Sequence, residues 1–286
     1  MQATVLAVFV GCHLGFAYFL STAVLLEYRP SLIMAIAAGV LALGVFQVVQ
    51  YATGFGAAPT GKFNAGVLSL KVGLPVGVAW CTMEQPAFLV PAVSLVSFVQ
   101  AGNSLHPGCA LLVLFMIHYF QRAYVYPWLS RGRPYPLHAW ASAMLFCISN
   151  GTAQSNELLY GPVRSEPWSV LAEPRTVLGC AIFVFGMAAN IHSDYILRNL
   201  RKPGESAYRI PRGGLFEYVS GAHFVAEILE WSGFAIATNG AMAPLAFAAF
   251  NWMGIGTRAM ATHAWNQKKF GDDYPQGRKR LIPFVW

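Results

Sequence analysis

The chain has 286 residues, of which 56% are hydrophobic and only 11% are charged, whereas about 25% are charged in soluble domains. Together with a mean hydropathy of +0.49, this excludes an ordinary soluble domain and indicates an all-α, polytopic bundle of membrane helices. The net charge of +7 would suggest nucleic acid as the partner of a soluble protein, but here the basic residues flank apolar segments, so membrane topology explains them.

Eight apolar segments are long enough to cross a bilayer as helices. They lie at residues 2–26, 31–53, 75–100, 108–128, 137–158, 176–197, 215–238 and 241–263. The first has neither a basic region before it nor a small-residue cleavage site after it, so we interpret it as a retained helix rather than a signal peptide. In the third, Glu84, Pro86 and Pro91 predict a helix that is broken or kinked.

Basic residues concentrate on one side of this topology. Of the 19 lysine and arginine residues, only Arg29, Arg164 and Arg175 lie in one set of alternate connections, and the rest lie in the other set, at its helix ends or in the C-terminal tail. Because cytoplasmic connections carry the excess of Lys and Arg, we expect a cytoplasmic C-terminus, in a bacterial inner membrane or the endoplasmic reticulum. We predict one integral-membrane domain over 1–286, with an additional N-terminal helix in 1–30 and a cytoplasmic tail at 264–286.

The third segment also carries a carboxyl group into an apolar helix. Ionisable residues inside a membrane are costly and are therefore candidates for function. Glu84, in apolar surroundings, could act as a hydrogen-bond donor or an acid. The alternative is that it binds the helix backbone freed by Pro86.

The fourth segment ends in an aromatic and basic surface. Tyr119, Arg122 and Tyr126 lie within about one sixth of the circumference of a regular helix, so they would share one surface. The turn that follows contains Arg131 and Arg133, whose guanidinium groups suit phosphate. The alternative for the tyrosines is an interfacial aromatic belt.

The stretch 190–204 begins inside the sixth segment and becomes basic toward its end. Asn190, Asp194, Arg198 and Arg201 lie at offsets of 0, 4, 8 and 11, along one helix face. A polar stripe that leads from the membrane to a basic end predicts a site for an anionic, hydrogen-bonding ligand. A basic cluster resting on acidic lipid headgroups would explain the arginines, but it would not explain Asn190 and Asp194.

A third polar group lies in the seventh segment. His223, Glu227 and Glu230 share one helix face, at offsets of 0, 4 and 7, and could bind a metal. Membrane di-iron hydroxylases need many clustered histidines, whereas the 7 histidines here are dispersed. The 5 cysteines show no metal or disulfide spacing and are interpreted as small buried hydrophobes. We therefore expect no metal, and a network around a polar cofactor instead.

Several long motifs, in order from about residue 60 to the end of the chain, match those of one family. They are 80–86, 118–122, 131–136, 190–204, 208–218, 227–231 and 274–284. On these motifs the chain resembles the membrane steroid 5α-reductases. The resemblance implies a core of seven helices, to which the helix at 2–26 is an addition.

The resemblance also implies an activity, which is the NADPH-dependent reduction of the Δ4 double bond of a 3-oxo-Δ4-steroid to the 5α product. Hydride goes to C5, Tyr119 and Glu84 hydrogen-bond the C3 oxygen, and Trp80 forms a wall of the steroid pocket. The positions that match the NADPH contacts of the family are Arg122, Tyr126, Arg131, Arg133, Asn190, Asp194, Arg201, Tyr208, His223, Glu227 and Arg258. The expected partners are a steroid or related lipid and membrane lipids, with no nucleic acid and no obligate protein partner.

Three positions depart from the family pattern. His223 stands where relatives have Asn, Thr262 where they have a His beside His263, and Asn266 where they often have Tyr. The alternatives are a related membrane reductase of polyprenols or of trans-2-enoyl-CoA, an isoprenylcysteine-type membrane methyltransferase that would use S-adenosylmethionine, and a non-enzymatic lipid-binding or transport protein.

Overall fold

The computed structural model describes residues 15, 27–54, 73–131, 134–201, 205 and 207–285. Apart from Gly15, the predicted N-terminal helix at 2–26 lies outside the described residues, and so does Arg133.

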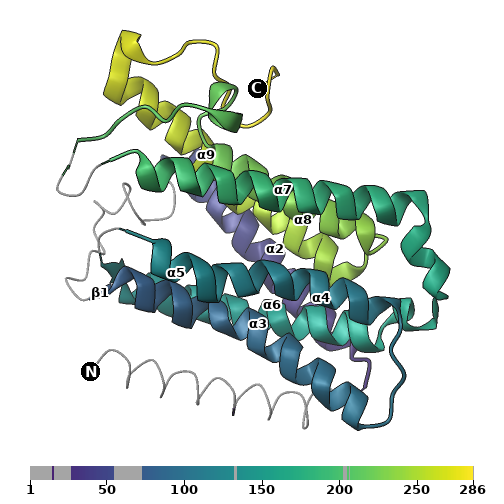
Figure 1. Cartoon of the computed structure of the whole chain (residues 1–286). Helices are drawn as coiled ribbons and strands as arrows, with labels where there is room; N and C mark the ends of the chain where they lie inside the picture. The colour runs from purple at the N-terminus through teal and green to yellow at the C-terminus, as the bar shows by residue number, and fades with distance from the viewer. Residues whose placement is uncertain are drawn as a thin grey trace.

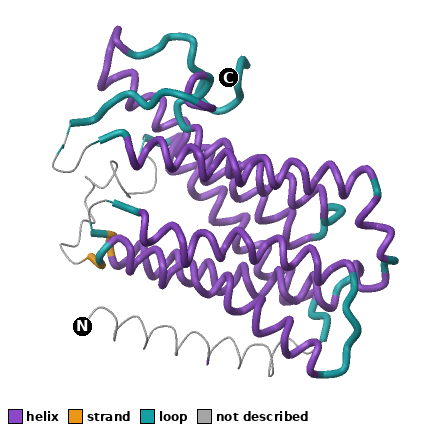
Figure 2. Tube along the Cα trace, in the orientation of Figure 1, coloured by secondary structure: helices purple, strands orange, loops and turns teal. Residues whose placement is uncertain are grey.

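The described chain forms a bundle of seven long helical segments (Figure 1). They are α2 (Pro30–Ala52), α3 (Val76–Gln100), α4 (Pro107–Phe120) continued by the π-helical η3 (Gln121–Val125) and α5 (Tyr126–Leu129), α6 (Leu137–Tyr160), α7 (Pro174–Asn199), α8 (Ala222–Ala237) and α9 (Met242–Phe270). One short antiparallel pair, β1 (Gly73–Leu74) with β2 (Tyr135–Pro136), stands out from the helices in Figure 2. The segments 30–52, 76–100, 107–129 and 174–199 are long and apolar enough to cross a membrane. The predicted all-α membrane bundle with a seven-helix core is confirmed.

The two ends of the bundle differ in charge. β1 and the segment after α7 lie at one end in Figure 1, and the connections 101–106 and 161–173 lie at the other. The second end carries Arg29, Arg164 and Arg175, whereas the first carries most of the basic residues of the described chain.

The helix α3 differs from the prediction, because it is one uninterrupted α-helix from Val76 to Gln100 with both prolines inside it. A proline removes one backbone hydrogen bond, and packing against a neighbouring helix can offset that loss. Here α6 covers the proline surface: a Cβ at Gly151 would lie 3.2 Å from the Pro86 carbonyl oxygen and 3.4 Å from the Pro91 ring. Of the predicted break or kink, the break was therefore wrong, and the kink stays a prediction.

Two helix ends also differ from the prediction. α8 begins at Ala222 rather than near 215, because the backbone just before it pairs with the C-terminal segment: Ser220 N–H donates to the Lys279 carbonyl (3.1 Å) and Lys279 N–H to the Tyr218 carbonyl (2.8 Å). α9 continues beyond 263 to Phe270, so the first part of the predicted tail is helical. The helix stops at Gly271, whose φ of 54° suits a residue without a Cβ.

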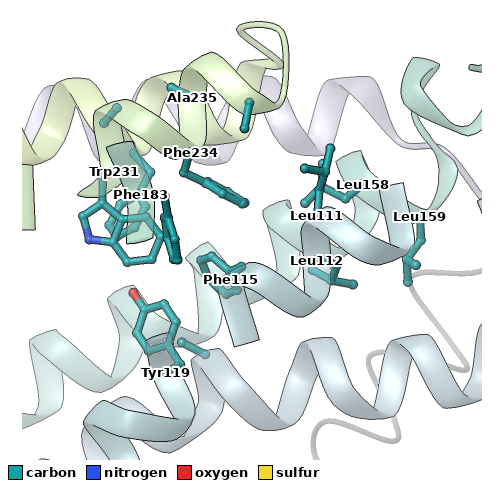
Figure 3. Packing of buried hydrophobic residues seen from close by; sticks show 14 of the residues in the cluster. Leu111, Leu112, Phe115, Tyr119, Leu158, Leu159, Phe183, Trp231, Phe234 and Ala235 are labelled. Atoms are coloured by element: carbon teal, nitrogen blue, oxygen red, sulfur yellow. The ribbon is translucent and has the colours of Figure 1, made fainter. Parts of the chain in front are cut away.

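The main hydrophobic core draws residues from α3, α4, α6, α7, α8 and α9, and Figure 3 shows the part between α4, α6, α7 and α8. Phe115, Phe183, Trp231 and Phe234 are at most 1% exposed and pack as a group of aromatic rings. Tyr119 belongs to the same group, and Figure 3 shows its hydroxyl on the side of Trp231. Such packing fixes the orientation of each ring, so the core also positions the phenol of Tyr119.

The C-terminal end of α6 holds the beginnings of two other helices. The Asn156 amide donates to the Glu27 carbonyl (2.7 Å) and accepts from Arg29 N–H (2.9 Å), just before α2. The Glu157 carboxyl accepts hydrogen bonds from the backbone N–H groups of Met242 and Ala243, the first residues of α9. These bonds satisfy polar groups that would otherwise be buried without partners.

Candidate active site

A buried arginine joins three of the helical segments. Arg122 is 8% exposed, and its Nη1 donates to Asp194 Oδ2 on α7 at 3.2 Å. The same guanidinium lies 4.7 Å from the ring centre of Trp80 on α3 and 4.5 Å from that of Tyr126 on α5. The carboxyl groups of Glu227 and Glu84 are also within its electrostatic range. Cation–π contacts and a buried ion pair together hold this side chain in one place.

The π-helical turn 121–125 divides the surface that the sequence predicted. A π turn adds a residue to the helical register, and such turns are frequent at functional sites. As a result, Tyr119 packs against Phe115 and Trp231, with ring centres 4.7 and 5.9 Å away. Arg122 and Tyr126 face Trp80 instead.

Tyr119 and Glu84 come together from α4 and α3. Tyr119 is 3% exposed, and its hydroxyl oxygen accepts a hydrogen bond from Asn150 Nδ2 on α6 at 3.3 Å. Glu84 Oε2 accepts from the Cys147 thiol at 3.7 Å, and its carboxyl lies within electrostatic range of the Tyr119 phenol. Because Cys147 and Asn150 are three residues apart on α6, the predicted pair lies against one face of that helix, and Arg122 is within electrostatic range of Glu84.

Beside this pair lies a buried His–Glu contact that the sequence did not predict. His118 Nδ1 and Glu230 Oε1 are 2.7 Å apart, and both side chains are at most 5% exposed. The sequence placed Glu230 with His223 and Glu227, whereas the structure pairs it with a residue of α4. Among the described residues, no three His, Cys, Asp or Glu side chains are grouped as metal ligands.

Two of the predicted cofactor residues, Asn190 on α7 and Arg258 on α9, contact α8. Asn190 Nδ2 donates to the His223 carbonyl oxygen at 2.9 Å and so ties α7 to α8. Arg258 on α9 lies 5.3 Å from the ring centre of Phe224 and within electrostatic range of Glu227. Arg258 is also within electrostatic range of Tyr135. Burial raises the pKa of the Tyr135 phenol.

A second group lies at the basic end. The Arg201 guanidinium is 5.3 Å from the ring centre of Tyr208, whose ring contacts Trp265 at 4.8 Å. Arg131 is exposed after α5. The structure thus divides the predicted residues between the buried Arg122 cluster and this exposed group.

One position that departs from the family pattern, Asn266, has a structural partner. Its Nδ2 donates to the hydroxyl of Tyr274 (3.3 Å), which donates to Ser220 Oγ (2.7 Å). Ser220 Oγ in turn lies 2.6 Å from His263 Nδ1. This buried chain of hydrogen bonds fastens the C-terminal segment to α9 and to the backbone before α8.

Sequence reasoning missed the contribution of α6 to the site. Asn150, Gln154 and Cys147 were not singled out, and Cys147 was treated only as a small hydrophobe, whereas its thiol contacts Glu84. A signal was present: two amide side chains four residues apart inside an apolar segment lie on one helix face, and polar groups in a membrane helix face the bundle interior.

Fold and site together define an integral-membrane helical protein with a buried, charged and hydrogen-bonded centre. The family model described as 3-oxo-5-alpha-steroid 4-dehydrogenase matches residues 133–286. The 3-oxo-5-alpha-steroid 4-dehydrogenase 2 of Homo sapiens is 43% identical over 263 residues, covering 91% of this chain and 99% of that protein. The type 1 protein of Bos taurus is 44% identical over 216 residues (74% and 82%), and the type 2 protein of Rattus norvegicus is 45% identical over 226 residues (79% and 87%). The chain belongs to the 3-oxo-5-alpha-steroid 4-dehydrogenase family and is an oxidoreductase.

The residues present fit the nicotinamide cofactor that the family implies. Arg258 Nε and Ser193 Oγ are buried and have no hydrogen-bond partner within the described part of the chain. Ser193 lies on α7 beside Asp194, and the exposed Arg201 follows toward the basic end. Unsatisfied donors deep in the bundle and cations at its end suit a ligand with polar groups at one end and phosphates at the other.

Proposed function

We propose that this protein reduces the Δ4 double bond of a 3-oxo-Δ4-steroid to the 5α product and uses NADPH as the electron donor. The observation that carries the proposal is that two neighbouring residues of α6 bond to both groups: Asn150 Nδ2 donates to the Tyr119 hydroxyl at 3.3 Å, and the Cys147 thiol donates to Glu84 Oε2 at 3.7 Å. The names of the relatives support the substrate class, because they describe 3-oxo-steroid dehydrogenases.

The chemistry requires stabilisation of charge at the C3 oxygen. When bound, NADPH supplies the hydride that adds to C5 of the steroid. Negative charge then develops on the C3 oxygen, to which the Tyr119 hydroxyl and a protonated Glu84 donate hydrogen bonds. A proton added at C4 then completes the saturation and restores the C3 ketone. Donors fixed before the reaction are worth more in a dry site than in water, because they need no reorganisation and are not screened.

The surrounding side chains keep the site ordered and dry. Phe115 and Trp231 bury the Tyr119 ring, and Cys147 donates to Glu84. Trp80, whose ring contacts Tyr135 at 6.1 Å, forms a wall of the steroid pocket in this proposal.

The remaining predicted residues hold NADPH. The buried part of the cofactor seat is formed by Arg122, Tyr126, Asn190, Asp194, His223, Glu227 and Arg258, and its phosphate end by Arg131, Arg133, Arg201 and Tyr208. Within the buried part of the seat, the ion pair between Arg122 and Asp194 holds both side chains in place. The number of arginines favours NADPH over NADH, because the 2′-phosphate adds charge that guanidinium groups bind well.

The same proposal includes the topology. The protein is a single membrane domain whose basic end and C-terminus face the cytoplasm, where NADPH is available. A cysteine introduced near Gly277, in the exposed C-terminal segment, should react with an impermeant thiol reagent only from the cytoplasmic side of sealed vesicles.

The experiment that tests the function is a product assay with the purified protein in lipid vesicles. NADPH and a Δ4-3-ketosteroid such as testosterone should give the 5α-reduced ketone, identified by mass spectrometry and chromatography against both C5 epimers. NADPH oxidation with a trans-2-enoyl-CoA or a polyprenol, and none with the steroid, would overturn the proposal. Thermal stabilisation by S-adenosylmethionine rather than NADPH would favour a methyltransferase.

A further inference from the structure

Two amide side chains of α6 form a hydrogen-bonded relay that ends on Tyr119. Gln154 Nε2 donates to Asn150 Oδ1 at 3.1 Å, and Asn150 Nδ2 donates to the Tyr119 hydroxyl oxygen at 3.3 Å. Gln154 is 0% exposed, and Asn150 and Tyr119 are each 3% exposed. The three groups are therefore shielded from solvent.

The direction of the relay determines where the phenol proton points. Because the Asn150 oxygen already accepts from Gln154, it is the NH₂ group of Asn150 that faces Tyr119. The Tyr119 oxygen accepts this bond, and its single O–H proton is left to point away from α6. A phenol oxygen that accepts a hydrogen bond is also polarised into a stronger donor.

Without Asn150, the hydroxyl of Tyr119 would be free to rotate about its C–O bond. Part of the free-energy cost of orienting the hydroxyl would then arise while charge develops on the substrate, which raises the barrier. Donors held in place before the reaction avoid this cost.

We propose that Asn150 and Gln154 are positioning residues that hold the Tyr119 hydroxyl as a donor toward the C3 oxygen of the substrate. Asn150 acts directly on the phenol, and Gln154 acts by fixing the amide orientation of Asn150. The proposal rests on the proposed function, because it concerns the same hydroxyl and the same charge.

The test replaces each amide with an apolar side chain of similar size. Asn150→Leu removes the donor to Tyr119, and Gln154→Met releases the Asn150 amide. Thr152→Val is the matched control, since Thr152 is buried in the same turn of α6 but its hydroxyl donates to the Ile148 carbonyl of its own helix, at 2.8 Å, rather than to Tyr119. We expect kcat to fall about 10-fold in Asn150→Leu, less than the 10²–10³-fold expected when a donor itself is removed. Gln154→Met should fall by a smaller factor, and Thr152→Val should stay near wild type.

A double-mutant cycle separates positioning from a purely structural role. Each amide substitution is repeated in the Tyr119→Phe background, where no hydroxyl remains to be held. The proposal predicts that kcat of Tyr119→Phe is then not lowered further by either substitution, and that KM for the steroid changes less than kcat. An equal fold-loss in both backgrounds, or a loss in Thr152→Val as large as that in Asn150→Leu, would overturn it.

The experiment still decides if one variant fails to fold or if the wild type is inactive. If Asn150→Leu does not accumulate as folded protein, the same cycle with Gln154→Met decides. A wild-type protein without steroid reduction would defeat the proposed function and this inference together, whereas an active wild type with additive substitutions defeats only the inference.

Discussion

Removing the Tyr119 hydroxyl is the most informative single change. Tyr119→Phe keeps the ring, which contacts Phe115 at 4.7 Å, His118 at 5.0 Å and Trp231 at 5.9 Å, so the aromatic core should survive. The structural loss is one hydrogen bond, which leaves the buried NH₂ of Asn150 without this partner and costs about 1–3 kcal/mol. The chemical loss is one donor to the developing charge, which should lower kcat by about 10²–10³-fold.

The assay measures kcat, KM for the steroid and NADPH affinity in the same preparation. Tyr124→Phe is a matched control, because the Tyr124 hydroxyl also accepts one hydrogen bond inside the bundle, from Gln85 Nε2 at 3.2 Å. Tyr124→Phe should retain near-normal kcat, and both variants should bind NADPH as the wild type does. If kcat of Tyr119→Phe stays within a few-fold of wild type, the assignment of Tyr119 as a donor is refuted.

Three other changes test separate parts of the account. Glu84→Gln should also lower kcat severely while the protein folds and binds NADPH, and near-normal turnover would remove Glu84 from the mechanism. Arg122→Met leaves the Asp194 carboxylate without its ion-pair partner, which should lower the folding stability by about 3–5 kcal/mol and reduce the yield of folded protein. Adding Asp194→Leu should restore the yield but not the affinity for NADPH, as measured by fluorescence titration. The pKa of Glu217 is lowered, chiefly by the N–H of Gly213, which donates to its carboxylate at 2.5 Å. A carboxylate with a lowered pKa in the folded state stabilises the fold above its usual pKa of about 4.3. This stabilisation is lost as pH falls through the folded-state pKa. The thermal midpoint of Glu217→Gln should therefore lie below wild type at pH 6 and approach it toward pH 3, and a constant difference would contradict this.

The sequence was sufficient to predict the helices and most of the charged residues at the centre of the bundle. Segment length and hydropathy predicted eight spans, and the resemblance to the family predicted the seven-helix core. The long described helices all lie within predicted apolar segments or extend them, because a membrane helix needs a long apolar run whatever it packs against. Glu84, Arg122 and Asp194 could be chosen because ionisable residues inside apolar segments are expensive, and the structure does bring Arg122 into contact with Asp194.

The remaining features depend on packing that the sequence does not display. The pair of His118 with Glu230 joins residues 112 positions apart, on two helices whose facing sides meet only in the folded bundle. The π turn at 121–125 shifts Tyr119 away from the surface that regular helix geometry predicts. α8 begins late because the backbone at Val219, just before it, pairs with Lys279 in the C-terminal segment.

The most direct test of the central claim follows a single hydrogen atom. NADPH deuterated on the transferring face of its nicotinamide C4 is incubated with the protein and a Δ4-3-ketosteroid, and the product is analysed by NMR. We expect deuterium at C5 in the α configuration, and we expect the labelled product to form about 10²–10³-fold more slowly with Tyr119→Phe. A product without deuterium at C5, or with the 5β configuration, would contradict it.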